Sequence, residues 1–331
     1  MNEYTERLEK IEAELKRWLP DNPSSVWAEK IFPGVGEKVQ AESIQLLFEP
    51  LKDILFRGGK RWRPLLMTLV CETLGGKDAA IPLSPLVEFT HNASLIHDDI
   101  EDESDERRGK PAVHKIYGVD TAINSGSFFY FLSLCCIESA ANKEHVFKLW
   151  AECLRRLHLG QSMDISWHRN ISYVPGFEEY YLMCGMKTGS LARLAAELGS
   201  FVAGASPETA RQLGEAAEKF GIGFQILDDV KNLTTGIPGK KRGDDVVEGK
   251  KSLPVLLYLH KYPEKQKKVF YCFHAARTEG IAAPEVEDLI DLLTTSGVLA
   301  EAEEKGRSLI NEAQVAFGPH TLLDGFFSLI S

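Results

Sequence analysis

Two clusters of acidic residues have the side-chain types and the spacing to hold divalent cations. In the first, within HNASLIHDDIED, His91, Asp98 and Asp102 are separated by seven and four residues, which places them on one face of a helix. Asp99 lies about 100° around the axis, close enough to join them. Carboxylates one turn apart destabilise a helix unless a cation separates them. Because Mg²⁺ favours one or two carboxylates plus phosphate oxygens, this stretch predicts a magnesium and phosphate site.

A second cluster with similar spacing lies far downstream, in GFQILDDVKN. Gln225, Asp228, Asp229 and Asn232 follow one another at i, i+3, i+4 and i+7, again one helical face. Either cluster alone could be an ordinary solvated helix end. Two such helices facing each other would form a cage of carboxylates that holds several Mg²⁺ ions and, through them, a diphosphate.

Basic residues near the first cluster could bind a phosphate group without a metal. Lys60 and Arg63 stand at a helix start in GGKRWRP, where the helix terminus itself favours anions. Arg107 and Arg108 follow the acidic block, and arginine makes bidentate contacts to phosphate. His91, on the metal-binding face, is either a further diphosphate contact or a packing residue.

The segment Lys187-Thr188-Gly189 interrupts a long apolar helix. A buried lysine needs an anionic partner. A glycine inside a helix predicts a kink or a close approach of another backbone, and a kink would turn free carbonyl groups toward a developing carbocation. Gln161 and Asp164, in GQSMDISW, are expected to face inward as structural hydrogen-bonding residues.

Composition narrows the class of protein. The chain has 331 residues, 44% of them hydrophobic and 26% charged, as in globular proteins. A net charge of −10 argues against a nucleic-acid partner. No apolar run reaches the roughly 18 to 20 residues that a membrane span requires. The six cysteines lack metal-ligand spacing, and the N-terminus lacks a signal-peptide core, so we expect a reducing, cytoplasmic location.

Helical periodicity dominates the chain. It predicts an N-terminal helix within 1–19 and further helices near 38–56, 64–75, 82–100, 119–140, 144–168, 177–204 and 207–232, then C-terminal helices over 252–331. The predicted loops cover 21–37, 103–115 and 233–251. We therefore expect an all-α fold, a single-domain helical bundle around a deep central cavity.

These motifs, in this order, resemble those of the trans-isoprenyl diphosphate (polyprenyl) synthases. The resemblance covers roughly residues 40–260 and rests on GGKRWRP, HNASLIHDDIEDESDERRGKP, GQSMDISW, KTG, GFQILDDVKN and GDDVVEGKKSLP. It implies a single synthase domain over 1–331 and a head-to-tail prenyl transfer from an allylic diphosphate to isopentenyl diphosphate. It also implies two or three Mg²⁺ ions, with Mn²⁺ as an alternative, and a homodimer. The wide apolar arc of the helix at 119–140 supports the homodimer weakly.

The resemblance also assigns roles to individual residues. The metal-binding set would be Asp98, Asp102 and Asp228, supported by Asp99, Asp229 and Asn232. Isopentenyl diphosphate would be held by Lys60, Arg63, His91 and Arg108. The allylic diphosphate and the cation would be served by Arg107, Lys187, Thr188, Gln225, Lys240 and Lys250, with Lys187, Thr188 and Gln225 as the catalytic residues.

Product length is expected to be twenty carbons. Many family members carry Asp where this chain has Asn232, and the Asn resembles eukaryotic-type geranylgeranyl diphosphate synthases. Thr90, Ala93 and Ser94, about one or two turns before Asp98, would line the tunnel for the growing chain, and all are small. A longer polyprenyl synthase (thirty carbons or more) and a farnesyl diphosphate synthase remain open, as does a non-catalytic partner subunit. A terpene cyclase usually lacks GGKRxRP, and a ferritin-type bundle needs Glu-x-x-His pairs that are absent from these faces.

Overall fold

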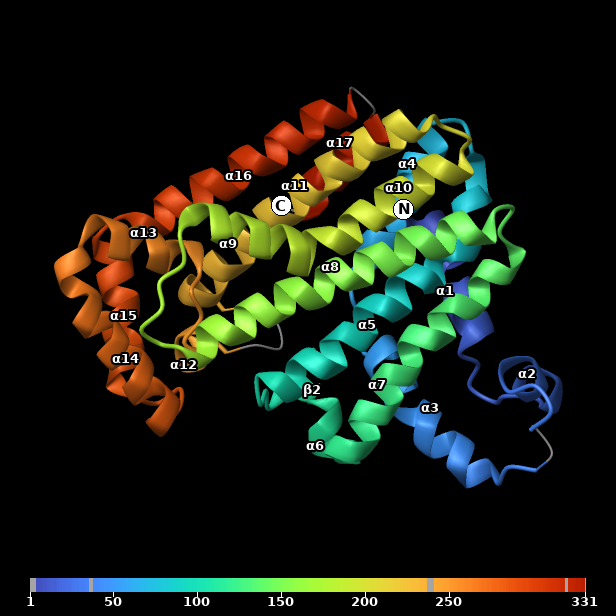
Figure 1. Cartoon of the computed structure of the whole chain (residues 1–331), viewed down its shortest axis with the longest axis horizontal. Helices are drawn as coiled ribbons and strands as arrows, with labels where there is room; N and C mark the ends of the chain where they lie inside the picture. Colours follow the sequence, from blue (N-terminus) through green and yellow to red (C-terminus); the bar gives the residue numbers. More distant parts are fainter. Residues whose placement is uncertain (1–3, 36–37, 237–240, 319–320, 331) are drawn as a thin grey trace. The chain divides into compact units, whose positions relative to one another are not determined.

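The structure is a computed structural model that describes residues 4–35, 38–236, 241–318 and 321–330 (Figure 1). These residues form two compact units. The first comprises Met1–Ala151 with Leu194–Ala210, and the second comprises Glu152–Arg193 with Arg211–Ser331. The single domain expected from the sequence stays a prediction, as does its central cavity.

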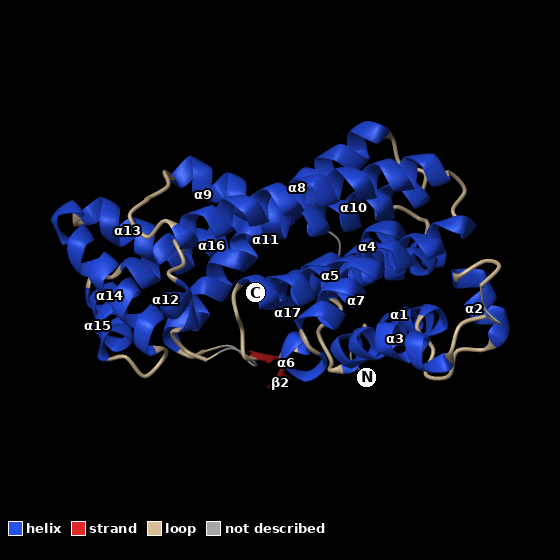
Figure 2. Ribbon diagram, turned by 60° about the horizontal axis from the view of Figure 1, so that its bottom comes forward, coloured by secondary structure: helices blue, strands red, loops and turns tan. Residues whose placement is uncertain are grey.

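The all-α prediction is confirmed. Helices dominate the described residues, and they contain one short pair of strands (Figure 2). The helices and strands within residues 5–169 are α1 (Thr5–Trp18), α2 (Ser25–Ile31), α3 (Ala41–Phe56), α4 (Trp62–Thr73), α5 (Ser84–Glu101), β1 (Glu106–Arg107), β2 (Lys110–Pro111), α6 (Val113–Tyr117), α7 (Val119–Leu134) and α8 (Lys143–Arg169). The remaining helices are α9 (Phe177–Cys184), α10 (Ser190–Val202), α11 (Pro207–Thr234), α12 (Asp244–Glu248), α13 (Leu253–Lys261), α14 (Gln266–Glu279), α15 (Pro284–Thr295), α16 (Val298–Phe317) and α17 (Thr321–Ile330).

Helix α5, which carries the first acidic cluster, packs along α7. The Phe89 and Phe129 rings meet at a centroid distance of 4.7 Å, and the His97 ring stacks on Tyr130 at 5.7 Å. A Cβ atom at Gly126 of α7 would lie 2.7 Å from the His97 ring, so only glycine allows this approach. Most of the first four turns of α5 are buried. The packing holds the polar C-terminal end of α5 in a fixed place.

A two-residue hairpin follows the acidic end of α5. β1 and β2 pair antiparallel, with Glu106 opposite Pro111 and Arg107 opposite Lys110. The loop residues Arg108 and Gly109 both have positive φ, at 54° and 73°, as a type I′ turn requires. This hairpin lies inside the segment 103–115 that the sequence predicts as a loop. The turn of the hairpin directs the Arg108 side chain back toward α5.

In the second unit, Gly160 of α8 and Gly221 of α11 lie close to a π-helical turn, Gly185–Gly189. A Cβ atom at Gly160 of α8 would lie 2.4 Å from the Lys187 backbone nitrogen. A Cβ atom at Gly221 of α11 would lie 2.7 Å from the Gly189 Cα atom. The interruption predicted at Lys187-Thr188-Gly189 is therefore present, with a close backbone approach on two sides.

Other helix boundaries differ from the predicted ones. The predicted loops at 21–37 and 233–251 contain α2 and α12, and the helix predicted over 119–140 leaves α-helical geometry after Leu134. Ser24 starts α2 because its hydroxyl accepts a hydrogen bond from the Trp27 amide, a standard N-cap that hydrophobic periodicity does not reveal. Among the helices described, none is long and apolar enough to cross a bilayer.

Candidate active site

The first acidic cluster divides into exposed and buried carboxylates. Asp98 and Asp102, at the end of α5, are half-buried, whereas the Asp99 side chain is completely buried. Arg107 of the hairpin donates from Nε to Asp99 Oδ1 at 2.8 Å, and its Nη2 lies 3.4 Å from Asp98 Oδ2. Arg107 therefore fixes the inner carboxylate and leaves Asp98 and Asp102 partly open to solvent.

Asp99 keeps one oxygen atom available. Its Oδ2 atom is buried and has no hydrogen-bond partner among the described residues. Burial raises the pKa of Asp99, although Arg107 opposes that shift. A buried carboxylate oxygen without a donor is the kind of group that a cation or its bound water would satisfy.

His91 of α5 contacts Arg63 of α4 directly. Arg63 Nη1 and His91 Nε2 are 3.1 Å apart. Arginine can only donate, so the Nε2 atom accepts and the imidazole is neutral with its proton on Nδ1. Burial, together with the positive charges of Arg63 and Arg108, holds the pKa of His91 well below its usual value. Lys60, which precedes these residues, is exposed.

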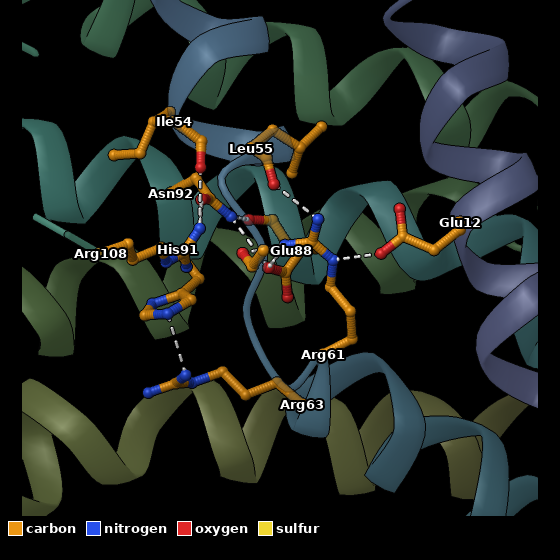
Figure 3. Close-up of polar contacts among 10 residues, drawn as sticks. Glu12, Ile54, Leu55, Arg61, Arg63, Glu88, His91, Asn92 and Arg108 are labelled. Atoms are coloured by element: carbon orange, nitrogen blue, oxygen red, sulfur yellow. Dashed lines mark hydrogen bonds and ion pairs between the residues drawn. The ribbon is translucent and has the colours of Figure 1, made fainter. Parts of the chain in front are cut away.

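The Arg108 side chain extends from the hairpin to α5 and α3. Its Nη1 atom donates to the Ile54 carbonyl oxygen at 2.8 Å and to Asn92 Oδ1 at 3.1 Å. Figure 3 shows Arg63 and His91 beside this residue. Among the described residues no carboxylate forms an ion pair with Arg108. Its guanidinium is therefore hydrogen-bonded to neutral oxygen atoms, and the nearby Glu88 offsets its charge without contacting it.

The second acidic cluster repeats the division seen in the first. Asp228 of α11 is half-buried, and Asp229 is 1% exposed. Lys250 Nζ and Gln225 Nε2 donate to Asp229 Oδ1 at 2.7 and 2.8 Å, and the Tyr180 hydroxyl donates to Oδ2 at 3.2 Å. Thr188 Oγ1 donates in turn to Gln225 Oε1 at 2.6 Å. The structure thus joins Thr188, Gln225, Asp229 and Lys250 in one hydrogen-bonded chain.

Lys250 remains a cation in this chain. Desolvation lowers its pKa, but the nearby Asp229 and Asp245 carboxylates outweigh desolvation and raise the pKa well above its usual value. Asp245 Oδ2 lies 3.6 Å from Lys250 Nζ. In both clusters, then, the second aspartate of the pair is buried against a cation, while the first is accessible.

Asn232 is buried and organises the loop that leads to Lys250. Its Nδ2 atom donates to the Lys241 carbonyl oxygen at 3.2 Å, and its Oδ1 atom accepts from the Asp245 amide at 3.2 Å. This arrangement needs a donor and an acceptor on one side chain, which asparagine supplies and aspartate does not. The structure therefore gives Asn232 a loop-holding role, and its metal-supporting role stays a prediction.

Lys187, in the π-helical turn, contacts the side chain of Asp164. Its Nζ atom lies 2.6 Å from Asp164 Oδ2, and His168 Nε2 lies 2.9 Å from Oδ1. Burial raises the pKa of Asp164, but Lys187 and His168 outweigh burial and hold the pKa well below its usual value. Asp164 is thus the anionic partner that a half-buried lysine needs. Gln161 of the same motif is buried.

The remaining predicted residues lie as follows. Lys240 is outside the described residues. Thr90 and Ala93 are fully buried on α5, and Ser94 is half-buried there. Thr90 Oγ1 accepts from Trp150 Nε1 at 2.9 Å and donates to the Leu86 carbonyl oxygen at 2.6 Å. The tunnel-lining role of Thr90, Ala93 and Ser94 stays a prediction.

The oxygen ligands present fit Mg²⁺ only when a further ligand shares the ion. Within the described part of the chain, no three acidic, histidine or cysteine side chains converge closely enough to hold a metal ion. Asp98, Asp102 and Asp228 are accessible carboxylates, and Asp99 Oδ2 is an unsatisfied one. Mg²⁺ is commonly held by one or two carboxylates plus substrate phosphates and waters, which matches this donor set.

Comparison with known proteins decides the family. The polyprenyl synthetase family model matches residues 44–290. The chain belongs to the polyprenyl synthetase family. It is 35% identical over 266 residues to a short chain isoprenyl diphosphate synthase of Methanocaldococcus jannaschii, covering 78% of this chain and 80% of that protein. It is 32% identical over 290 residues to a geranylgeranyl pyrophosphate synthase of Penicillium janthinellum, covering 85% and 78%.

The fold agrees with this assignment. A crystal structure of a geranylgeranyl pyrophosphate synthase superposes with a TM-score of 0.82 at 25% identity, covering 100% of this chain and 96% of that one. The predictions of a polyprenyl synthetase, of a trans-prenyltransferase enzyme and of an all-α isoprenoid-synthase fold are therefore confirmed.

Sequence reasoning missed several residues that hold these side chains in place. They are Arg61, Glu88 and Asn92 in the first unit, and Tyr180 and Asp245 in the second. Glu88 and Asn92 share a face of α5 one turn apart, and this spacing was the one signal available. The partners of Tyr180 and Asp245 are distant in sequence, so no local pattern pointed to them.

Proposed function

We propose that this polyprenyl synthetase condenses isopentenyl diphosphate with an allylic diphosphate to give geranylgeranyl diphosphate. One observation carries the division of roles. Arg63 contacts the neutral His91, and Arg108 contacts neutral oxygen atoms of Ile54 and Asn92. In contrast, Arg107 contacts Asp98 and Asp99, and Lys250 contacts Asp229, so each of these cations lies at an acidic pair. The first group suits a diphosphate bound without metal, and the second suits a diphosphate bound through Mg²⁺.

The residues of the chain then act in sequence. Asp98, Asp102 and Asp228 would hold Mg²⁺, which would supply charge neutralisation for the leaving diphosphate. Asp99 and Asp229 support this site by holding the side chains of Arg107 and Lys250. Arg107 and Lys250 hold the allylic diphosphate as its carbon–oxygen bond breaks and an allylic cation forms. Arg107 and Lys250 are already in place before the reaction begins. Such preorganised charges are a general source of electrostatic stabilisation in enzymes.

The second substrate supplies the electrons for the new bond. Lys60, Arg63, His91 and Arg108 hold isopentenyl diphosphate so that its double bond attacks the allylic cation, forming a carbon–carbon bond. The tertiary cation that results loses a proton, and the released diphosphate accepts it. The side-chain oxygen atoms of Thr188 and Gln225 favour positive charge at the allylic end, and Lys187, paired with Asp164, serves the allylic diphosphate.

Product analysis tests this function. Purified enzyme with Mg²⁺ and labelled isopentenyl diphosphate would receive five-, ten- and fifteen-carbon allylic primers in turn. Discrete twenty-carbon product is expected, products of thirty carbons or more would indicate a longer-chain synthase, and fifteen-carbon product a farnesyl diphosphate synthase. Absence of elongation with every primer, in folded protein, would refute catalysis and favour a non-catalytic partner subunit.

A substitution in the predicted tunnel tests the product length. Ser94→Phe is preferred to Ala93→Phe, because Ser94 is half-buried and a larger side chain there need not overpack a closed interface. Product shortened below twenty carbons is expected. An unchanged product length would remove Ser94 from the tunnel.

We also propose that the enzyme is a cytoplasmic homodimer. The apolar residues Val119, Ile123 and Phe131 are 49%, 45% and 65% exposed and lie at intervals of four and eight residues on α7. This stripe suits a second copy of the chain. All six cysteines are free, which suits a reducing compartment.

A further inference from the structure

Two arginines of the first unit have backbone conformations that arginine rarely adopts. Arg61, which precedes α4, has φ 48°, and Arg108, in the hairpin turn, has φ 54°. A left-handed conformation is unfavourable for a residue other than glycine. Such strain persists where surrounding contacts determine the conformation. Figure 3 shows both side chains turned onto the same stretch of α5.

Arg61 is held by three different elements. Its Nη1 atom donates to Glu88 Oε1 of α5 at 3.0 Å, and its Nε atom donates to Glu12 Oε1 of α1 at 2.6 Å. Its Nη2 atom donates to the Leu55 carbonyl oxygen of α3 at 2.6 Å. Arg61 and Glu88 are only 5% and 2% exposed. A buried pair that is hydrogen-bonded in this way fixes the geometry of the residues around it.

Asn92 connects this pair to Arg108. It lies one turn after Glu88 and is fully buried. Its Nδ2 atom donates to Glu88 Oε1 at 2.9 Å, and its Oδ1 atom accepts from Arg108 Nη1 at 3.1 Å. The connected chain thus runs from Glu12 through Arg61, Glu88 and Asn92 to Arg108.

The glycine loop that carries Lys60 lies directly against both guanidinium groups. A Cβ atom at Gly59 would lie 3.3 Å from Arg108 Cζ and 3.4 Å from Arg61 Nη1. Gly59 also has φ 129°, a conformation that other residues rarely adopt. The position of this loop therefore depends on where the two arginines are held.

We propose that Glu88 and Asn92 are positioning residues for the isopentenyl diphosphate subsite, because together they fix Arg61, the glycine loop and Arg108 as one frame. This rests on the proposed function, which places that diphosphate at Lys60, Arg63, His91 and Arg108. Glu88 offsets the repulsion between Arg61 and Arg108. Asn92 holds Arg108 through a hydrogen bond to a neutral oxygen atom. The charge of Arg108 therefore stays available to the diphosphate.

Two substitutions at Asn92 test this proposal, because one adds a charge and the other removes the hydrogen bonds. Asn92→Asp keeps an oxygen for Arg108 but adds a carboxylate that pairs with its charge and faces Glu88. Asn92→Leu removes both hydrogen bonds at similar volume. We expect the KM for isopentenyl diphosphate to rise about tenfold in Asn92→Leu and further in Asn92→Asp, where tenfold corresponds to about 1.4 kcal/mol. The KM for the allylic primer and kcat should stay within about threefold, given that the other subsite is untouched.

Glu88→Gln is the conservative variant, and Glu72→Gln is the matched control. Glutamine at 88 still accepts from Arg61 and Asn92, so it should give a smaller rise in the isopentenyl diphosphate KM than Asn92→Leu. Glu72 pairs with Arg7 between α4 and α1 at 2.6 Å, an ion pair that is more exposed than Arg61–Glu88. Its loss should lower the melting temperature and leave both KM values unchanged.

The outcomes separate this inference from the proposed function. Suppose that the wild-type enzyme elongates the primers. If the Asn92 variants then leave the KM for isopentenyl diphosphate unchanged, or raise both KM values equally, the network is only structural. A wild type that elongates no primer would refute the proposed function and its subsite together. If Asn92→Leu does not fold, Asn92→Asp and Glu88→Gln give the same comparison.

Discussion

At the scale of single residues, the contact between Arg63 and His91 sets a dependence of stability on pH. His91 is neutral when folded because burial and the surrounding Arg63, Arg108, Arg107 and Arg61 lower its pKa well below 6.5. In the unfolded chain it titrates near 6.5. Below that pH the unfolded state binds more protons, so the stability that His91 contributes above pH 6.5 is lost as pH falls toward its folded pKa.

This dependence should disappear in His91→Gln. Between pH 7.5 and 5.5 the wild type should lose about 1 kcal/mol more unfolding free energy than the variant. Urea unfolding of both proteins at the two pH values measures this difference, and the other histidines cancel in the comparison. Equal losses would mean that folding does not lower the pKa of His91.

Asn232 gives a second residue-scale prediction. Asn232→Asp replaces the group that donates to the Lys241 carbonyl with a carboxylate that repels it. We expect a loss of about 1–3 kcal/mol of stability and faster hydrogen exchange at the Asp245 amide. If the variant instead binds Mg²⁺ more tightly with no loss of stability, Asn232 acts in place of an acidic ligand.

The spacing of acidic and basic residues predicted which side chains belong to the candidate site. It could not predict which aspartate of each pair is buried and which is accessible. Asp98 and Asp99, like Asp228 and Asp229, are adjacent in sequence and equivalent in type. Which one turns inward depends on Arg107 in one case and on Lys250 and Tyr180 in the other. Those partners come from hairpins, loops and other helices, so only the folded chain identifies them.

At the scale of helices, the π-helical turn depends on the absence of a side chain at Gly160. Gly160→Ala would place a Cβ atom 2.4 Å from the Lys187 nitrogen and force α8 and the turn apart. Overpacking of this kind typically costs about 1–3 kcal/mol. We expect a lower melting temperature and a reduced kcat, because Lys187 moves relative to Asp164.

Gly176→Ala is the matched control for this prediction. The nearest atom to a Cβ there is Glu179 Oε2 at 3.7 Å, an ordinary contact, and φ is −70°. Its melting temperature and kcat should match the wild type. A Gly160→Ala variant that behaves the same way would show that α8 can shift freely past the turn.

Periodicity located the long helices well because each has one apolar face, as α5 and α11 show. It did not locate the short elements, since the hairpin at Glu106–Pro111 and helix α12 have too few residues for a period. The hairpin had one local signal, because Arg108-Gly109 offers a glycine at the second loop position. The π-helical turn was predicted only as an interruption, because its geometry follows from neighbouring helices.

At the scale of the whole molecule, the exposed stripe on α7 leads to a prediction about assembly. Ile123→Glu with Phe131→Glu should convert a homodimer into a monomer, because two charges would have to be buried at the interface. Analytical ultracentrifugation measures the mass directly. Val315→Glu, at an 80% exposed position on α16, should leave the mass unchanged. A wild type that sediments as a monomer would refute the homodimer.

The pairing of each inner aspartate with a cation has a kinetic consequence. Arg107 and Lys250 already cancel part of the negative charge of the two acidic clusters before any ligand arrives. Free Mg²⁺ should therefore bind weakly in titration calorimetry without diphosphate, and the ion should enter together with the allylic substrate. Such an enzyme would take up Mg²⁺ as a complex with the diphosphate of the primer, and not as an ion bound beforehand.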